Sequence, residues 1–282
     1  MHNRRQAPPR FAPTPAAKEH ASLQVEFAEL SDVGQVRTNN EDYIGHVAPD
    51  SAAKARSHGW LFVLADGVGG GAQGEVASRT AVETILSSYE GSSASEPVGS
   101  LLAGLVKAAN TRVHEAGVTA GPSGAGMATT IVACAVRYDR AYVTHVGDSR
   151  CYLIRNRSIK CLTRDHTVAN EQIRLGIGSG EDNRHVLSRA VGTEIFVTPA
   201  VTDVGVQAGD TLLLCSDGLH GAVSDPEIAK IICANPDFNT AAKRLIGIAN
   251  ELDGGDNVSV QLIRIRDVER MGVYRGRPYK LK

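Results

Sequence analysis

Two pairs of helical segments divide the strand-like runs of this 282-residue chain into groups. The pairs are residues 74–89 with 100–117 and residues 225–234 with 239–252, where Ala, Val, Ile and Leu recur at helical spacing. Short apolar or β-branched runs, typical of strands, occupy residues 23–30, 59–65, 129–136, 141–146, 151–154, 211–215 and 257–265. This order predicts an α+β fold, a four-layer α-β-β-α sandwich in which two antiparallel sheets pack face to face with the helix pairs outside.

Two stretches refine this prediction. The runs at 129–136, 141–146 and 151–154 are separated by turn-like Tyr-Asp-Arg and Gly-Asp-Ser-Arg sequences, which predicts a meander of adjacent antiparallel strands. Residues 163–192 are polar and contain glycines, with a short helical candidate at 168–175. We interpret this stretch as a mobile insertion beside the core.

The ends of the chain differ from its centre. Residues 1–22 are expected to form a disordered Pro/Ala-rich leader, residues 23–266 the catalytic domain, and residues 267–282 a basic C-terminal tail. The leader has no apolar segment after its basic residues, and no stretch approaches the roughly 20 apolar residues that span a bilayer. The five cysteines are odd in number and scattered, as expected of free thiols in a reducing cytoplasm. We therefore expect a cytoplasmic protein without a membrane partner.

Acidic residues stand at the ends of the strand-like runs. Glu41 and Asp42 follow the first run, and the later ones are Asp66, Asp148, Asp217 and Asp256. Several strand ends can bring carboxylates to one edge of a sheet, where hard cations with oxygen ligands would relieve their repulsion. Glycine is paired with an aspartate in D-G-V-G-G-G (66–71), G-D-S-R (147–150), S-D-G-L (216–219) and G-G-D-N (254–257). One such pair is an ordinary turn signal, but four at strand ends favour a Mg²⁺ or Mn²⁺ site.

Ordered motifs cover most of the chain, from about residue 25 to residue 265. They are G-Q-V-R-T-N-N-E-D (34–42), A-D-G-V-G-G (65–70), G-M-A-T-T (126–130), V-G-D-S-R (146–150), L-T-R-D-H-T (162–167), V-L-S-R-A-V-G (186–192), C-S-D-G-L (215–219) and D-N-V-S (256–259). Together they resemble the metal-dependent serine/threonine protein phosphatases of type 2C, the PPM family, in their bacterial form. The resemblance implies an α-β-β-α sandwich with a binuclear metal site at one end of the sheets.

The same resemblance implies the metal ligands. Asp66 would bridge two Mn²⁺ or Mg²⁺ ions, the carbonyl of Gly67 would bind one of them, and Asp217 and Asp256 would bind the other. Glu41 and Asp42 would hold the ions through water. Asp148 would share a third, looser ion with Asp217 in the way that bacterial members do.

Arg37 would bind the substrate phosphate, since its fork of donors matches phosphate oxygens. By resemblance, a water activated by the two ions attacks the phosphorus of phosphoserine or phosphothreonine. Val68 replaces a histidine proposed as general acid in many eukaryotic relatives, so a metal-associated water or His166 is left as the proton donor. Residues 168–185 resemble the flap of the family.

Partners follow from the same reading. The resemblance implies phosphorylated proteins as partners, including a serine/threonine kinase of the Hanks type and the targets of that kinase, and we expect a monomer. The net charge of −1 offers no overall attraction for nucleic acid, and the basic tail is interpreted as a solvated segment. An anti-anti-sigma-type regulatory phosphatase and an inactive binding module are the alternatives. An inactive member usually lacks a metal aspartate, and none is missing here.

Overall fold

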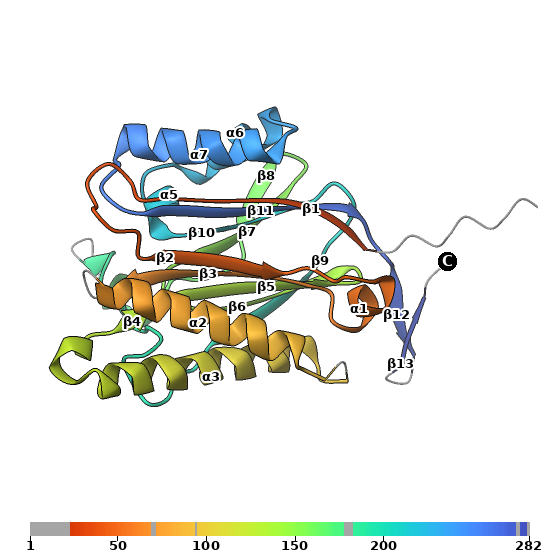
Figure 1. Ribbon diagram of the computed structural model, residues 1–282. Coiled ribbons are helices and arrows are strands. Elements are labelled where there is room, and N and C mark those ends of the chain that lie inside the picture. Colours follow the sequence, from red (N-terminus) through yellow and green to blue (C-terminus); the bar gives the residue numbers. More distant parts are fainter. Residues whose placement is uncertain (1–22, 69–71, 94, 178–182, 275–276, 281–282) are drawn as a thin grey trace, which may run out of the picture.

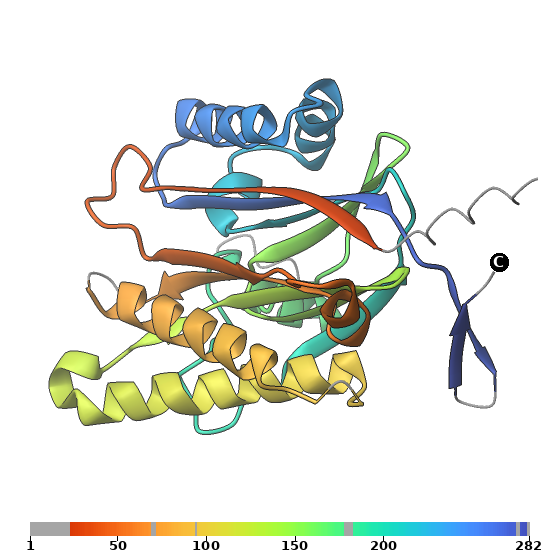
Figure 2. The same ribbon diagram turned by 45° about the vertical axis from the view of Figure 1, so that its right-hand side comes forward.

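The computed structural model describes the chain except residues 1–22, 69–71, 94, 178–182, 275–276 and 281–282, so the expected leader lies outside the described residues. Two antiparallel sheets lie face to face, and a pair of helices covers the outer face of each (Figure 1). Figure 2 shows the same four layers from a second direction. The prediction of an α-β-β-α sandwich is therefore confirmed.

Each sheet combines strands from distant parts of the chain. One sheet has the order β2-β3-β5-β6-β9, with β4 paired to β3: β2 (Asp42–Val47), β3 (Trp60–Val68), β4 (Ala128–Thr129), β5 (Ile131–Arg137), β6 (Arg140–Val146) and β9 (Ala200–Gly205). The other has the order β1-β11-β10-β7-β8: β1 (Gln24–Asp32), β11 (Val258–Asp267), β10 (Thr211–Cys215), β7 (Arg150–Arg155) and β8 (Ser158–Cys161). Because β1 and β11 pair along their whole length, the two ends of the domain are joined.

The outer layers are α2 (Ala72–Glu90) with α3 (Val98–Thr119) and α6 (Asp225–Ala234) with α7 (Phe238–Leu252). Helix α7 shows why the sequence forms these layers: its buried residues recur at one-turn spacing, namely Phe238, Ala241, Ala242, Leu245, Ile246 and Ala249. Asp237 caps its first turn by accepting a hydrogen bond from the amide of Thr240 at 2.8 Å. The shorter helices are α1 (Ala52–Ser57), α4 (Val168–Arg174), α5 (Asp217–His220) and the 3₁₀ turn η1 (Gly121–Gly124).

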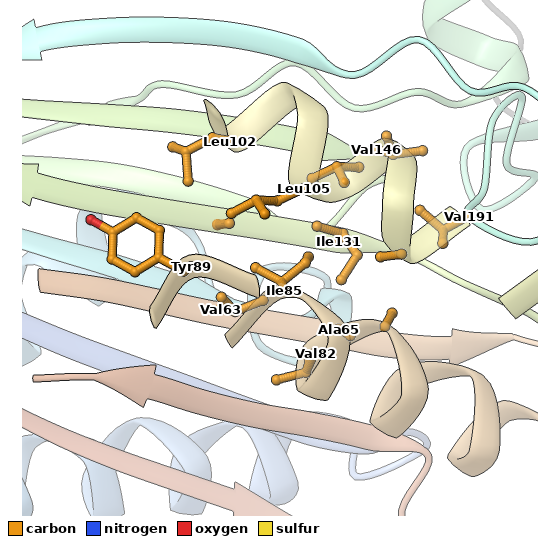
Figure 3. Packing of buried hydrophobic residues seen from close by; sticks show 14 of the residues in the cluster. Val63, Ala65, Val82, Ile85, Tyr89, Leu102, Leu105, Ile131, Val146 and Val191 are labelled. Atoms are coloured by element: carbon orange, nitrogen blue, oxygen red, sulfur yellow. The ribbon is translucent and has the colours of Figure 1, made fainter. Parts of the chain in front are cut away.

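Strand β3 is buried on both faces. Val63 and Ala65 belong to the cluster packed against the helix layer, which also contains Ile85 of α2 and Leu102 of α3 (Figure 3). Phe62 lies in a second cluster between the two sheets. Burial on both faces explains why residues 59–65 read as an unbroken apolar run instead of an alternating one. The strand therefore ends at a fixed point, where it carries the first candidate metal ligand.

The expected meander is only partly correct. Strands β5 and β6 pair as a hairpin, but the third run, now β7, pairs with β10 and β8 in the opposite sheet. The chain crosses between the sheets at the Gly-Asp-Ser segment, where Gly147 has φ +101° and a Cβ on it would lie 2.7 Å from the Thr130 side chain. The prediction for the third strand was wrong because a turn-like sequence does not distinguish a hairpin from a crossing between sheets.

The C-terminal segment contains a hairpin. Strands β12 (Met271–Tyr274) and β13 (Arg277–Lys280) pair with each other and project away from the sandwich (Figure 1). Over the described residues, no helix has the length and apolar character needed to cross a membrane.

A histidine and glutamate pair lies between β1 and β2. His46 Nδ1 lies 2.8 Å from Glu29 Oε2, and this hydrogen bond raises the pKa of His46 against the opposing effect of burial. A raised pKa in the folded state means that the pair stabilises the fold below the unfolded pKa of about 6.5 and that this contribution is lost as pH rises through the folded pKa.

We expect His46→Gln to be destabilising by about 1 kcal/mol or less at pH 5.5, with the difference from wild type shrinking at pH 8.5. Urea unfolding at the two pH values measures it. His114→Gln is the control, because His114 contacts the carbonyl of Gly192 at 3.0 Å instead of a carboxylate. An equal loss at both pH values in His46→Gln would contradict the assignment.

Candidate metal centre

A cavity of about 760 Å³ opens at the edge where both sheets end. Seven of the residues expected to act at the site line it: Arg37, Glu41, Asp66, Gly67, Asp148, Asp217 and Asp256. The eighth, Asp42, is buried beneath it at 6% exposure. The structure thus brings together residues that are up to 219 positions apart in the chain.

Strand pairing explains this convergence. Asp42 opens β2 and is the direct partner of Asp66 near the end of β3. In the other sheet, β10 and β11 are antiparallel, so Asp217, which follows β10, and Asp256, which precedes β11, reach the same edge. This edge is the left-hand one in Figure 1, where α2 and α5 begin.

Burial and mutual repulsion shift the carboxylates. The pKa of Asp66 lies well above its ordinary value because the side chain is desolvated and because Asp42 and Asp217 carry like charges. Burial raises the pKa of Asp42 to about 7, against hydrogen bonds from Ser259 and Ser216. Burial and then the charge of Asp217 raise the pKa of Asp148 to about 7. The group can be fully ionised at neutral pH only if positive charge is added.

Two buried oxygens test whether divalent ions fit. Oδ1 of Asp42 and Oδ1 of Asp217 have no hydrogen-bond partner among the described residues. A buried oxygen without a partner costs about 1–3 kcal/mol, so it needs a compensating group. Carboxylate oxygens are the donors that Mg²⁺ and Mn²⁺ prefer, and the residues present therefore fit these ions.

The site is not a closed cage of side chains. Within the described residues, no three His, Cys, Asp or Glu side chains are gathered closely enough to hold an ion by themselves. Mg²⁺ commonly keeps several waters and uses only one or two carboxylates. An open set of oxygens in a cavity agrees with that mode of binding.

Glycine is required at two of the Asp-Gly pairs by close backbone approach. A Cβ on Gly67 would lie 2.2 Å from the carbonyl oxygen of Gly74 and 2.7 Å from that of Glu41. A Cβ on Gly218 would lie 2.1 Å from the carbonyl oxygen of Asn257. These glycines let the aspartates that precede them approach neighbouring segments, so they are more than ordinary turn residues.

Hydroxyl groups of Ser216 and Thr130 hold two of the aspartates in position. Ser216 Oγ donates to Asp42 Oδ2 at 2.8 Å and accepts from the amide of Ser259 at 2.9 Å, which joins the two sheets. The amide of Asp66 donates to Thr130 Oγ1 at 3.1 Å. The sequence did not identify Ser216 or Thr130 as site residues, although they lie in the motifs C-S-D-G-L and G-M-A-T-T.

Arg37 faces the acidic group from the loop between β1 and β2. Its Nη2 lies 3.0 Å from Asp256, whose charge raises the pKa of the guanidinium. Asn257 holds this loop: its Oδ1 accepts from the amide of Glu41 at 2.8 Å, and its Nδ2 donates to the carbonyls of Val33 and Asn39 at 2.9 and 3.0 Å. Sequence reasoning missed Asn257, although it is the second residue of the D-N-V-S motif.

His166 is poorly placed as a proton donor. It is buried, its Nδ1 accepts from the amide of Gly147 at 3.2 Å, and it stacks on His145 with ring centroids 4.7 Å apart. Burial, then His145 and Arg189, lower its pKa to about 4, so it is neutral near pH 7. His166 therefore acts as a brace of the insertion, together with Asp165, which accepts two hydrogen bonds from Arg150 at 2.9 and 2.7 Å.

Comparison with known proteins shows which family has this sequence and this site. The family model for protein phosphatase 2C matches residues 35–252. The chain belongs to the protein phosphatase 2C family. Protein phosphatase PhpP of Streptococcus pneumoniae is 30% identical over 250 residues, covering 86% of this chain and 98% of that protein. Serine/threonine phosphatase stp of Listeria monocytogenes is 32% identical over 253 residues, covering 86% and 96%.

Solved structures agree with this type 2C assignment. The Mycobacterium tuberculosis serine/threonine phosphatase PstP/Ppp superposes with a TM-score of 0.74 at 33% identity, covering 86% of this chain and 99% of that one. A catalytic domain of PstP in complex with two manganese ions gives a TM-score of 0.73 at 34% identity, covering 87% of this chain and 100% of that one.

Proposed function

We propose that this chain is a serine/threonine protein phosphatase that hydrolyses phosphoserine and phosphothreonine on proteins with the help of two Mn²⁺ or Mg²⁺ ions. The observation that carries the proposal is that Asp66, Asp148, Asp217, Asp256 and Arg37 line one cavity. Negative oxygens can hold the ions there, and a guanidinium can hold the phosphate.

Each residue has a role in this proposal. Asp66, the Gly67 carbonyl, Asp217 and Asp256 would hold the two ions, with Glu41 and Asp42 acting through water and Asp148 serving a third ion. When bound, the ions supply positive charge to the phosphoryl oxygens and acidity to water. Arg37 would exchange Asp256 for phosphate oxygens, and Asn257 would keep its loop in place for that exchange.

The cysteines support this chemistry by their position. None of the five lines the cavity, and Cys134, Cys151 and Cys215 are buried as free thiols. A cysteine nucleophile would have to reach the phosphate, so hydrolysis by water is the fitting class of reaction.

Free thiols also support residence in the cytoplasm. Proteins phosphorylated by a serine/threonine kinase of the Hanks type, and that kinase itself, are the proposed partners, and a monomer is the proposed state.

The direct test is phosphate release from a phosphothreonine peptide. We expect no turnover by protein treated with EDTA and its restoration by excess Mn²⁺ or Mg²⁺. Absence of turnover in the presence of Mn²⁺, with peptide binding retained, would favour a binding module over an enzyme.

Arg37→Gln should lower kcat/KM for this peptide about 10- to 100-fold, because charged hydrogen bonds to phosphate contribute about 1.5–3 kcal/mol. Arg37→Lys should recover part of the loss, since it keeps the charge but not the fork. Arg140→Gln is the matched control: its side chain is 46% exposed against 47% for Arg37, and it pairs with Asp203 away from the cavity. Equal rates for Arg37→Gln and Arg140→Gln would refute the phosphate role.

A further inference from the structure

Arg189 lines the same cavity as Arg37 but comes from a different segment of the chain. Its side chain is 40% exposed, whereas the next two residues, Ala190 and Val191, are buried. Arg189 is neither a proposed metal ligand nor the residue proposed to bind the phosphate. It places a second guanidinium group in a wall that is otherwise rich in carboxylates.

The backbone around Arg189 is held on both sides. Val191 exchanges two hydrogen bonds with Thr129, at 2.8 and 3.0 Å, and Thr129 is the strand partner of Gly67. The amide of Ser188 donates to the carbonyl of His166 at 2.8 Å. Because the backbone is already fixed, a ligand that binds Arg189 has to order its side chain but not the loop that carries it.

Arg189 has an exchangeable partner. Its Nη2 lies 2.9 Å from Glu171 Oε1 in helix α4, while Arg174 Nε lies 2.7 Å from Glu171 Oε2. The pKa of Glu171 is lowered by Arg174 first and also by Arg189, so the carboxylate is ionised at neutral pH. Half-exposed ion pairs contribute about 0–1 kcal/mol, which a competing anion can replace.

Charge decides which ligand suits this position. Arg37, which pairs with Asp256 at the candidate metal centre, is already assigned to the phosphate to be hydrolysed. Arg189 pairs instead with a residue outside the cavity lining. It is therefore the guanidinium that can accept an anion in addition to the phosphate to be hydrolysed.

We infer that Arg189 is a specificity-determining residue that binds a second anionic group, a carboxylate or a phosphate, on the same peptide as the phosphorylated serine or threonine, and that Glu171 competes for it. This inference rests on the proposed function, because it assumes that a phosphopeptide occupies the cavity. It predicts a preference for phosphosites with acidic or phosphorylated neighbours.

Peptide binding tests the inference separately from hydrolysis. Three labelled peptides carry the same non-hydrolysable phosphonate analogue of phosphothreonine and differ at one nearby position, which is alanine, glutamate or a second phosphonate analogue. Fluorescence anisotropy in Mn²⁺ gives Kd for each. We expect the wild type to prefer both anionic peptides, Arg189→Gln to reduce that preference about fivefold, and Glu171→Gln to increase it by a similar factor.

Arg174→Gln is the matched control, since Arg174 contacts the same Glu171 but does not line the cavity; it should not lower the preference as Arg189→Gln does. If Arg189 and Glu171 only anchored α4, Arg189→Gln and Glu171→Gln would weaken the binding of all three peptides by the same factor. This result would overturn the inference. A wild type that binds all three peptides equally would overturn it as well. The glutamate and phosphonate arms show which anion is preferred. Failure of the proposed function would instead show as absent phosphate release from the hydrolysable peptide.

Discussion

Asp66→Asn is expected to lower kcat/KM for a phosphothreonine peptide by about 10³-fold or more, measured as phosphate release in Mn²⁺. Asp66 is the carboxylate that would contact both ions, and a bound metal contributes several kcal/mol of transition-state stabilisation, with each 1.36 kcal/mol equal to a tenfold change in rate. Asp50→Asn is the control, because Asp50 pairs with Lys54 on the surface and its side chain is 67% exposed.

The same substitution should not unfold the protein. Burial and the charges of Asp42 and Asp217 raise the pKa of Asp66, so a neutral amide removes repulsion from the metal-free site. We expect metal-free Asp66→Asn to melt at the wild-type temperature or above it. The wild type should gain stability when Mn²⁺ binds the folded state, and the variant should gain less. A large loss of metal-free stability in the variant would mean that Asp66 acts as a structural residue.

Phe62→Ala is expected to reduce the free energy of unfolding by about 3–5 kcal/mol, the cost of removing a large side chain from a packed core. Phe62 is completely buried between the sheets, 5.3 Å from the ring of Phe27 and 6.4 Å from that of Trp60. Urea unfolding followed by circular dichroism measures the change. Phe196→Ala is the matched control at an 87% exposed position, where we expect a change of about 0.5 kcal/mol or less. Similar losses at the two positions would contradict the assignment of the core.

The sequence allowed the main layers to be predicted because their burial patterns are strong. Helix α7 has a regular apolar face, and β3 is apolar throughout, so both were located to within a few residues. Strands β8 and β9 were missed because they are short or exposed edge strands with few apolar side chains. Strand β2 was missed because it contains Gly45, where a Cβ would lie only 2.7 Å from Leu86 of α2. Glycine there reflects a tertiary contact that no local pattern shows.

The candidate site was predictable in its residues but not in its supports. Strand ends identified Asp66, Asp217 and Asp256, since an aspartate follows or precedes an apolar run at each. Their roles came from the resemblance to a family, and their convergence depends on pairing between strands far apart in the chain. Asn257 contacts the loop that carries Arg37, and Arg189 pairs with Glu171; only the fold brings these neighbours together. Both residues lie inside ordered motifs, D-N-V-S and V-L-S-R-A-V-G, but a motif does not show which neighbours a side chain contacts.

Anomalous diffraction from a crystal soaked in MnCl₂ tests the central claim most directly. We predict manganese peaks in the cavity for two ions, within bonding distance of carboxylate oxygens of Asp66, Asp217 and Asp256. A well-ordered cavity with no manganese peak, at an Mn²⁺ concentration that supports full phosphatase activity, would contradict the account.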